Sequence, residues 1–259
     1  MILRVLAVAG LLIGVVPGAV GAQTAAEVML KHRQVHQLQD EEERHRLTLV
    51  SKSGATKERT VVRYTLSGAD HLDKILIRFL APREVESTAL LTWERKNGAD
   101  DQWLYLPATR KPKRIAASGK KNRFMGTDFT YEDLRPESIS VNTYTLAGAE
   151  GVDGQECFVV DSVPASERLA DDSGYSKRKL WVRKDNFSIV KREYYDKAGK
   201  LEKIEVSRKL VNVKGTAWRA DEVEMRDVQN GTRTTIVVER RKVEQGLKDD
   251  FFTEAELTR

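Results

Sequence analysis

Histidines and carboxylates at two places in the chain have types and spacings that could support chemistry. His32 and His36 are one helical turn apart, which is the spacing of a two-histidine metal pair. The Glu that a zinc-protease motif requires is missing between them, so positions on a polar helix face are favoured. Asp128, Glu132 and Asp133 could form a carboxylate cluster for acid–base work. Because their surroundings are rich in Thr and Gly, capping and solvated loop positions are favoured over that role.

The single cysteine, Cys157, excludes an intramolecular disulfide and points to a domain that is stabilised by core packing. It begins an apolar run at residues 157–160, where a buried, inert thiol is the favoured interpretation. A catalytic cysteine would need a nearby base and partial exposure. The sequence also contains no Gly-rich phosphate loop, no serine nucleophile elbow and no zinc-ligand spacing. These absences argue against an enzyme and predict neither a cofactor nor a metal site.

The most distinctive stretch is residues 102–134, which combines aromatic and basic side chains. A short strand at 103–106 ends at Pro107, and a second short strand is predicted at 114–117. No acidic residue lies between Asp101 and Asp128. This gap contains seven basic residues: Arg110, Lys111, Lys113, Arg114, Lys120, Lys121 and Arg123. Such a stretch could bind a ligand with an apolar body and an anionic head, although a solvated hairpin with core aromatics explains it more simply.

The elements around this stretch are mostly strands. Thr24 and Glu27 have capping-box spacing, which predicts a helix over residues 25–38. After Asp40 the hydrophobic period changes to two, which predicts a meander of eleven or twelve strands. The clearest lie at 45–51, 58–66, 74–80, 89–94, 102–106, 143–146, 157–163, 176–183, 188–195, 201–211, 218–227 and 232–243. Many have one apolar and one charged face, so we expect a single antiparallel sheet whose dry face is covered by helices or curls around a ligand.

The first residues have the layout of a secretory signal peptide. Arg4 precedes an apolar run at residues 5–16, Pro17 ends the run, and small residues follow up to Ala22. No cysteine lies near this point, so lipidation of the mature chain is not expected. We therefore expect a cleaved signal peptide at 1–22 and one exported, soluble domain at 23–259. The loss of Arg4 lowers the formal net charge from +5 to +4, which is no signature of nucleic-acid binding.

Several segments resemble the LolA-like family of outer membrane lipoprotein-sorting proteins. The resemblance begins with FLAP at residues 79–82 and continues with LLTW at 90–93 and DQWLYLP at 101–107. Its most specific part is FMGTDFTYEDL at 124–134, and FTEAEL at 252–257 is similar to the family's C-terminal ending. The resemblance covers nearly the whole mature chain.

This resemblance implies a mainly β (α+β) fold, an unclosed antiparallel barrel of about eleven strands with helices covering its concave face. In LolA and LolB the apolar cavity of this fold holds lipoprotein acyl chains. Similar members are commonly associated with RND-type exporters of the MMPL kind. The family has no shared catalytic residues.

The resemblance also turns the distinctive stretch into a set of candidate site residues. The candidates for an apolar cavity wall or lid are Leu91, Trp93, Trp103, Tyr105, Phe124, Met125, Phe129 and Tyr131. The candidates for contact with head groups or a protein partner are Arg110, Lys111, Lys113 and Arg114. Ordinary core packing remains the alternative for each aromatic residue, and a solvated loop remains the alternative for the basic ones.

The leading hypothesis is a periplasmic carrier, or chaperone, that binds lipid or lipoprotein acyl chains and moves them toward the outer membrane. Lipid cargo, transient membrane contact and an RND/MMPL-type exporter are the expected partners, and nucleic acid is not. The alternative is an envelope sensing module of the RseB type, with a stable protein partner. A third hypothesis, an envelope hydrolase that uses Asp128 or Glu132, predicts turnover that Asp128→Asn or Glu132→Gln would abolish.

Overall fold

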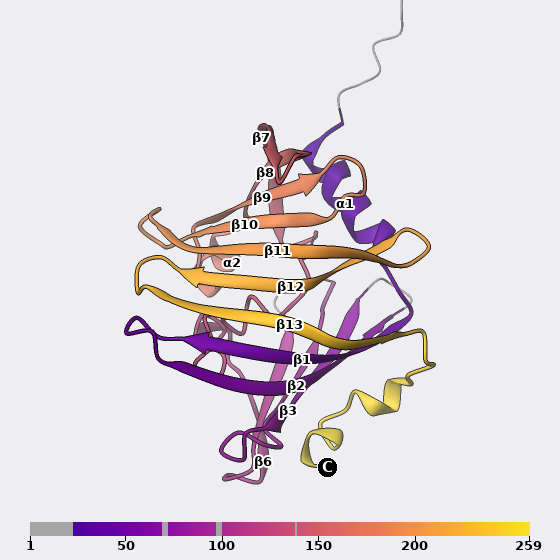
Figure 1. The fold of residues 1–259 in the computed structure, drawn as a ribbon, viewed down its shortest axis with the longest axis vertical. Helices are drawn as coiled ribbons and strands as arrows, with labels where there is room; N and C mark the ends of the chain where they lie inside the picture. Colours follow the sequence, from indigo (N-terminus) through magenta and orange to yellow (C-terminus); the bar gives the residue numbers. More distant parts are fainter. Residues whose placement is uncertain (1–22, 69–71, 97–99, 138) are drawn as a thin grey trace, which may run out of the picture.

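The strands of this chain form one antiparallel sheet that wraps into an unclosed barrel (Figure 1). The computed structural model describes residues 23–68, 72–96, 100–137 and 139–259. The signal peptide predicted at 1–22 and most of the connection between the strands predicted at 89–94 and 102–106 lie outside these residues. Within them, the sheet has thirteen strands in the order β6-β5-β4-β3-β2-β1-β13-β12-β11-β10-β9-β8-β7. The mainly β, unclosed barrel predicted from the sequence is confirmed, with thirteen strands instead of about eleven.

The bounds of the elements follow in chain order. The first half contains α1 (Ala25–Val35), β1 (Asp40–Val50), β2 (Thr56–Ser67), β3 (Asp73–Ala81), β4 (Ala89–Trp93), β5 (Asp101–Leu106), β6 (Lys111–Arg114) and the 3₁₀ turn η1 (Ala117–Gly119). The second half contains β7 (Asn142–Val152), β8 (Gln155–Pro164), α2 (Glu167–Asp172), β9 (Lys177–Arg183), β10 (Ile189–Tyr195), β11 (Leu201–Lys214), β12 (Ala217–Asp227), β13 (Thr232–Val243) and the 3₁₀ turns η2 (Asp249–Phe251) and η3 (Glu256–Thr258).

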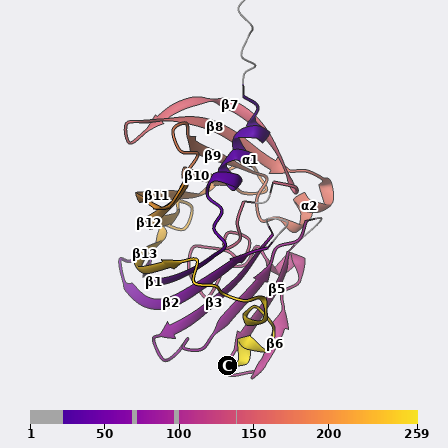
Figure 2. The same ribbon diagram turned by 90° about the vertical axis from the view of Figure 1, so that its right-hand side faces the viewer.

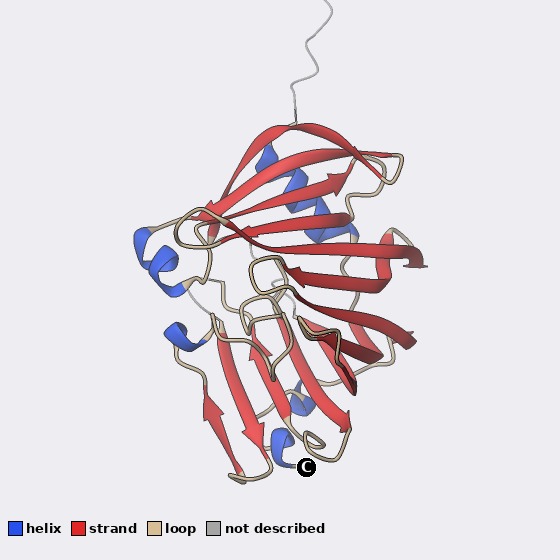
Figure 3. Cartoon of the chain, turned by 60° about the vertical axis from the view of Figure 1, so that its left-hand side comes forward, coloured by secondary structure: helices blue, strands red, loops and turns tan. Residues whose placement is uncertain are grey.

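The sheet consists of two meanders that meet at the pairing of β1 with β13. The chain runs outward from β1 to the edge strand β6, passes to the opposite edge at β7, and returns strand by strand to β13. The two edge strands do not pair with each other, so the barrel stays open. Residues 115–141, here called the crossing segment, connect the two edges. Figure 3 shows its loops in tan on the inner side of the sheet.

Helix α1 covers one end of the concave face. Thr24 and Glu27 form the predicted capping box, with the Thr24 hydroxyl accepting from the Glu27 amide. The helix ends at Val35, three residues before the predicted end. Val28 and Met29 are fully buried against a cluster that includes Leu180 of β9 and is centred on strands β8–β10. Apart from this helix, the concave face is covered by the irregular crossing segment.

A tight hairpin in the crossing segment packs onto the sheet. Its turn places Met125 and Gly126 at φ 48° and 75°, and the second position favours glycine because it has no Cβ. The Phe124 amide donates to the Phe129 carbonyl at 2.8 Å and closes the hairpin. Asp128 then anchors the hairpin to β13, because its carboxylate accepts from the Thr234 hydroxyl at 2.7 Å. The family-like FMGTDF string is therefore a hairpin that is fastened to the middle of the sheet.

The C-terminal segment covers the convex face of β3–β5. Phe252 and Leu257 are fully buried there, in a cluster with Leu76, Leu91 and Trp103. The Trp93 indole donates to the Phe252 carbonyl at 2.8 Å. Figure 2 shows the segment running from β13 to the ends of β5 and β6. The string at 252–257, which resembles the family's C-terminal ending, is therefore docked on the sheet.

Some strand boundaries differ from the sequence prediction. Strand β6 begins and ends three residues earlier than the strand predicted at 114–117. Strand β7 continues through Gly148 and Gly151 to Val152, beyond the predicted end at residue 146. A bulge between Leu146 and Gly148 absorbs the first glycine, as bulges do in edge strands. Cys157 is fully buried, and burial raises the pKa of its thiol. Among the described residues, no helix has the length and apolar character needed to span a membrane.

Candidate functional site: the central cavity

A cavity of about 400 Å³ lies on the concave side of the sheet. Its walls come from α1, from strands β1, β2 and β10–β13, and from residues 124–137 of the crossing segment. We call it the central cavity. The crossing segment reaches it because the chain must pass over the concave face between the two edge strands. A cavity of this size is in the range of small-ligand sites, roughly 300–1,000 Å³.

The inward side chains change from charged to apolar along the strands, and the change is in register across the sheet. On β1, Glu41 and Glu43 give way to His45 and then Leu47, all buried on alternate positions. Glu43 is opposite Arg63 of β2 and Arg241 of β13. Leu47, four residues further along β1, is opposite Ile236 of β13. The central cavity therefore has a charged end and an apolar end.

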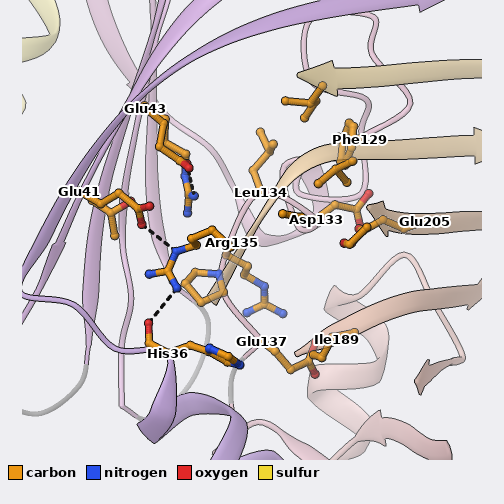
Figure 4. A pocket seen from close by; sticks show the side chains of 18 of the residues that line it. His36, Glu41, Glu43, Phe129, Asp133, Leu134, Arg135, Glu137, Ile189 and Glu205 are labelled. Carbon is orange, nitrogen blue, oxygen red and sulfur yellow. Dashed lines mark hydrogen bonds and ion pairs between the residues drawn. The ribbon is translucent and has the colours of Figure 1, made fainter. Parts of the chain in front are cut away.

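Arginines link the charged end into a network (Figure 4). The Arg219 Nε donates to the Glu41 carboxylate at 2.9 Å, and its Nη1 donates to the His36 carbonyl at 2.9 Å. The Arg241 Nε donates to the Glu43 carboxylate at 2.7 Å. In Figure 4, Arg135 of the crossing segment reaches into the space between these β1 carboxylates and Glu137.

The two β1 carboxylates have opposite electrostatic environments. Burial opposes ionisation of Glu43, but His45, Arg63 and Arg241 outweigh it and hold the pKa of this carboxyl well below its usual value. Burial, and then the negative charge of Glu43, raise the pKa of Glu41. The Oε1 atom of Glu41 has no hydrogen-bond donor, although it lies 3.1 Å from the Arg241 Nε. Glu41 is thus the carboxyl of this pair that more readily takes up a proton.

A second group of ion pairs lies near α1 and strands β9–β11. Arg178 donates to Glu137 at 2.9 Å, and Arg192 donates to Glu205. Burial would lower the pKa of the Arg178 guanidinium, but the Glu137 carboxylate outweighs it and raises that pKa. Such buried pairs keep both partners charged.

The carboxylates considered for acid–base work are held by structural partners. Asp133 accepts from the Lys203 ammonium at 2.8 Å and from the Tyr175 hydroxyl at 2.9 Å. Burial would raise the pKa of Asp133, but Lys203 holds it below its usual value. Glu132 accepts from the Ser173 hydroxyl at 2.7 Å and the Gly174 amide at 2.9 Å. These bonds order the crossing segment against strands β9–β11.

The two helix histidines face the central cavity, whereas the sequence favoured a polar helix face. The His32 Nδ1–H donates to the Phe187 carbonyl at 2.8 Å, and the Trp218 amide donates to the His36 Nδ1 at 3.1 Å. Burial lowers the pKa of His32 to about 3 and that of His36 to about 4, so both rings are neutral near pH 7. Within the described part of the chain, no group of three or more His, Cys, Asp or Glu could hold a metal ion.

Only part of the predicted apolar site lies at the central cavity. Phe124 and Phe129 line it, and Met125 and Tyr131 pack beside Phe124 in the cluster behind its wall. Four other candidates lie on the convex face beneath the C-terminal segment: Leu91, Trp93, Trp103 and Tyr105. Strand alternation directs these four away from the cavity, and Leu104 points to the concave side.

The predicted basic contact residues lie on the hairpin between β5 and β6, far along the sheet from the charged end of the cavity. Arg110, Lys111, Lys113 and Arg114 are exposed. Arg114 pairs with Asp101, and its side chain is still 68% exposed. The basic hairpin, as we call these four residues, therefore forms a surface feature separate from the central cavity.

Sequence reasoning missed the charged end of the central cavity. Glu41 and Glu43 lie in the run DEEERHRL at residues 40–47, which is charged on both faces and gives no clear apolar alternation. The available signal was that positions 41, 43 and 45 share a face with Leu47. Arg63 and Arg219 likewise alternate with apolar residues in their strands. Only the partner strands show that these side chains meet.

Comparisons with known proteins place the chain among proteins that share one fold. The model of a family described as "Uncharacterized protein" matches residues 71–259. A solved domain from Vibrio parahaemolyticus, proposed to be an outer membrane lipoprotein-sorting protein, is 30% identical, covers 91% of this chain and 98% of its own, and has a TM-score of 0.86. A DUF1329 family protein from Desulfovibrio piger is 27% identical over 90% of this chain and 97% of its own, with a TM-score of 0.83.

A LolA superfamily protein from Nitrosomonas europaea shares the fold at 19% identity. It covers 91% of this chain and all of its own, with a TM-score of 0.72. The comparison with curated proteins gave no match.

Proposed function

Because the chain belongs to the LolA-like family of outer membrane lipoprotein-sorting protein domains, we propose that it is a carrier for lipid or lipoprotein acyl chains. The cargo is held in the central cavity and moved toward the outer membrane. The function is non-catalytic, because binding and release of a lipid require no bond to be made or broken.

The observation that carries this proposal is the central cavity itself, on the concave side of a sheet that stays open. At its apolar end, Leu47, Phe124 and Phe129 offer a surface against which a chain can be shielded from water. Burying each methylene of an acyl chain is worth about 0.8 kcal/mol, so a wall of this kind retains a chain without specific polar contacts.

The basic hairpin is proposed as the contact with membranes. Its four cations are exposed at one edge of the sheet, where an anionic surface can approach them. Each basic residue near an anionic bilayer contributes about 1 kcal/mol of attraction. In this proposal the protein works in the periplasm after its signal peptide is removed. It receives its lipid cargo from an RND/MMPL-type exporter or passes the cargo to one.

Native mass spectrometry on protein isolated gently from the periplasm tests the carrier function. We expect a stoichiometric lipid or acylated peptide, which extraction from the same sample then identifies. Protein that is free of lipid and also takes up none from vesicles contradicts the proposal. That result favours the sensing module and a search for its protein partner.

A hydrolase is tested separately with Asp128→Asn and Glu132→Gln. We expect both variants to bind lipid as the parent protein does. We expect no hydrolysis of the lipid by the parent protein, and therefore no loss of hydrolysis in either variant. Hydrolysis of a bound ester that disappears in either variant contradicts the non-catalytic proposal.

A further inference from the structure

We propose that the cargo of the central cavity is an amphiphile with an acidic head group, a phosphate or a carboxylate, which the cavity arginines bind. This inference rests on the proposed carrier function and names the chemistry of its cargo. The head lies at the charged end, near Arg63 and Arg135, and the apolar chain extends toward Leu47 and Ile236.

The direction of the cargo follows from the register of the sheet. Arg63 and Val61 are alternate inward residues of β2, opposite Glu43 and His45 of β1. Two residues along a strand cover about 7 Å, so the inward surface changes from ionic to apolar over a short distance. A purely apolar chain leaves the charged end without a partner, and a purely polar solute leaves the apolar end in contact with water. An amphiphile matches both ends.

The charge of the head follows from the hydrogen-bond donors that remain. Four cavity guanidinium groups leave most of their N–H donors unused by the described residues. They belong to Arg63, Arg135, Arg178 and Arg192. Each guanidinium has five N–H donors.

The last three of these arginines donate one hydrogen bond each, to Asp100, Glu137 and Glu205. Arg63 makes only an ion pair, in which its Nη1 lies 3.5 Å from the Glu43 carboxylate. These guanidinium groups therefore keep N–H donors that an acceptor on a ligand can bind.

The cavity carboxylates, in contrast, have little accepting capacity to spare. Glu137 accepts from Asn142, Tyr144, Ser162 and Arg178. The Glu205 carboxylate accepts on one oxygen from Arg192 and on the other from the Tyr194 hydroxyl at 2.8 Å. A ligand rich in acceptors thus finds partners, whereas a cationic head finds carboxylates that are already occupied. Phosphate and carboxylate groups are the acceptors that guanidinium forks bind best.

Among these carboxylates, Glu41 differs, because its Oε1 receives no hydrogen bond and could still accept one. The groups that face it are Glu43 of its own strand, Arg63 of β2, Arg219 of β12 and Arg241 of β13. Burial, and then the negative charge of Glu43, raise the pKa of Glu41, so of the two β1 carboxyls it is the one that is more readily protonated.

Titration calorimetry tests this inference with probes that share one acyl chain and differ in their head groups. Each probe is used below its critical micelle concentration. The acidic probes are palmitic acid and palmitoyl lysophosphatidic acid, the neutral probe is monopalmitoylglycerol, and inorganic phosphate is tested alone. We expect both acidic amphiphiles to bind about tenfold more tightly than the neutral one, since each charge-assisted hydrogen bond contributes on this scale. Inorganic phosphate should bind far more weakly than either.

Two variants locate the effect, with one matched control. Arg63→Gln and Arg135→Gln should each reduce the preference for acidic probes and leave the affinity for monopalmitoylglycerol unchanged. Arg83→Gln, an exposed residue that does not line the central cavity, should change neither. The comparison of probes on the parent protein needs no variant, so it decides the matter even where a substitution prevents folding.

Equal affinity for acidic and neutral amphiphiles overturns the inference but leaves the carrier function intact. A preference that persists in both arginine variants also overturns it. Phosphate alone binding as tightly as the amphiphiles shows a free-anion site and overturns it as well. Failure of every amphiphile to bind overturns the carrier function and this inference together.

Discussion

The concave and convex faces of strands β3–β5 are both apolar, but only the convex face is covered by the C-terminal segment. On the convex face, Leu76, Leu91 and Trp103 are covered by Phe252 and Leu257 of the C-terminal segment. On the concave face, the hydrophobic cluster of Ile75, Ile77 and Leu90 continues toward β1 and β13, where the central cavity opens. One face is closed by the chain itself, and the other keeps space that another molecule can fill.

The two faces differ in the side chains that fill them. On the convex face, Trp93 and Trp103 pack edge to face with ring centroids 4.9 Å apart, and the Phe252 carbonyl of the C-terminal segment accepts from the Trp93 indole. The cavity side instead combines apolar residues with buried ion pairs such as Arg192–Glu205. Buried ion pairs add little net stability compared with well-packed apolar groups, so the two faces are stabilised in different ways.

The largest expected effect comes from opening the convex face. Phe252→Ala removes a fully buried ring and should lower the free energy of unfolding by about 3–5 kcal/mol. Lipid retention per folded molecule should not change, because the ring does not line the central cavity. Urea unfolding gives the first quantity, and native mass spectrometry of the folded fraction gives the second. Loss of bound lipid from folded Phe252→Ala protein would break the distinction between the two faces.

A matched pair of substitutions sharpens the same contrast. Phe129→Leu, on the cavity wall, should weaken lipid binding by about 1–2 kcal/mol through lost apolar contact. Trp103→Leu, on the convex face, should lower stability and leave the dissociation constant unchanged. Titration with one lipid probe measures both variants. An equal loss of affinity in the two variants would show that the convex face takes part in cargo binding.

The cavity side should also be the more sensitive to acid. The pKa of His32, about 3, lies below its ordinary value of 6.5, so the unfolded chain binds more protons between these values. The stability contributed by the neutral ring is complete above pH 6.5 and is lost as the pH falls toward 3. Between pH 6.5 and 5.5 the loss should be about 1 kcal/mol for this ring.

His32→Asn isolates this contribution, because an amide can still donate to the Phe187 carbonyl but does not titrate. Urea unfolding of parent and variant across this pH range gives the difference between them. Parallel pH profiles for the two proteins would contradict the assignment of a buried, neutral His32.

The smallest effect on stability is expected at the basic hairpin. Replacing Arg110, Lys111 and Lys113 by Gln should change the free energy of unfolding by less than about 0.5 kcal/mol, because these side chains are exposed. Binding to vesicles of anionic lipid should fall markedly in a flotation assay, and binding to neutral vesicles should not change. Unchanged flotation with anionic vesicles would remove the hairpin from the membrane contact.

Much of the fold could be predicted from local residue patterns. The capping box at Thr24 and Glu27 defined the start of α1, and the period-two alternation located most strands to within a few residues. Phe252 lies in a string that resembles the family's C-terminal ending, and it is buried against the sheet. These features depend on neighbours in sequence, so a sequence pattern can report them.

The candidate site depended on information of another kind. Alternation shows that Trp103 and Leu104 face opposite ways, but not which way is inward, because both faces of β5 are apolar. Residues 40–47 gave no sign of a cavity wall, because charged side chains occur on both faces of this strand. Phe124 and Phe129 were found because a family-like string contains them.

The amino-acid sequence by itself determined the fold class, the start of the helix and the alternation of each strand, because these follow from local hydrogen bonding and side-chain period. Only the tertiary structure decided which face is concave and which charges meet there. Glu43 and Arg63 come from the consecutive strands β1 and β2, whereas Arg241 comes from β13, which is distant in the chain and adjacent to β1 in the sheet. A charged side chain becomes part of a buried network only when the register places its partner opposite it, and that pairing is a property of the assembled sheet.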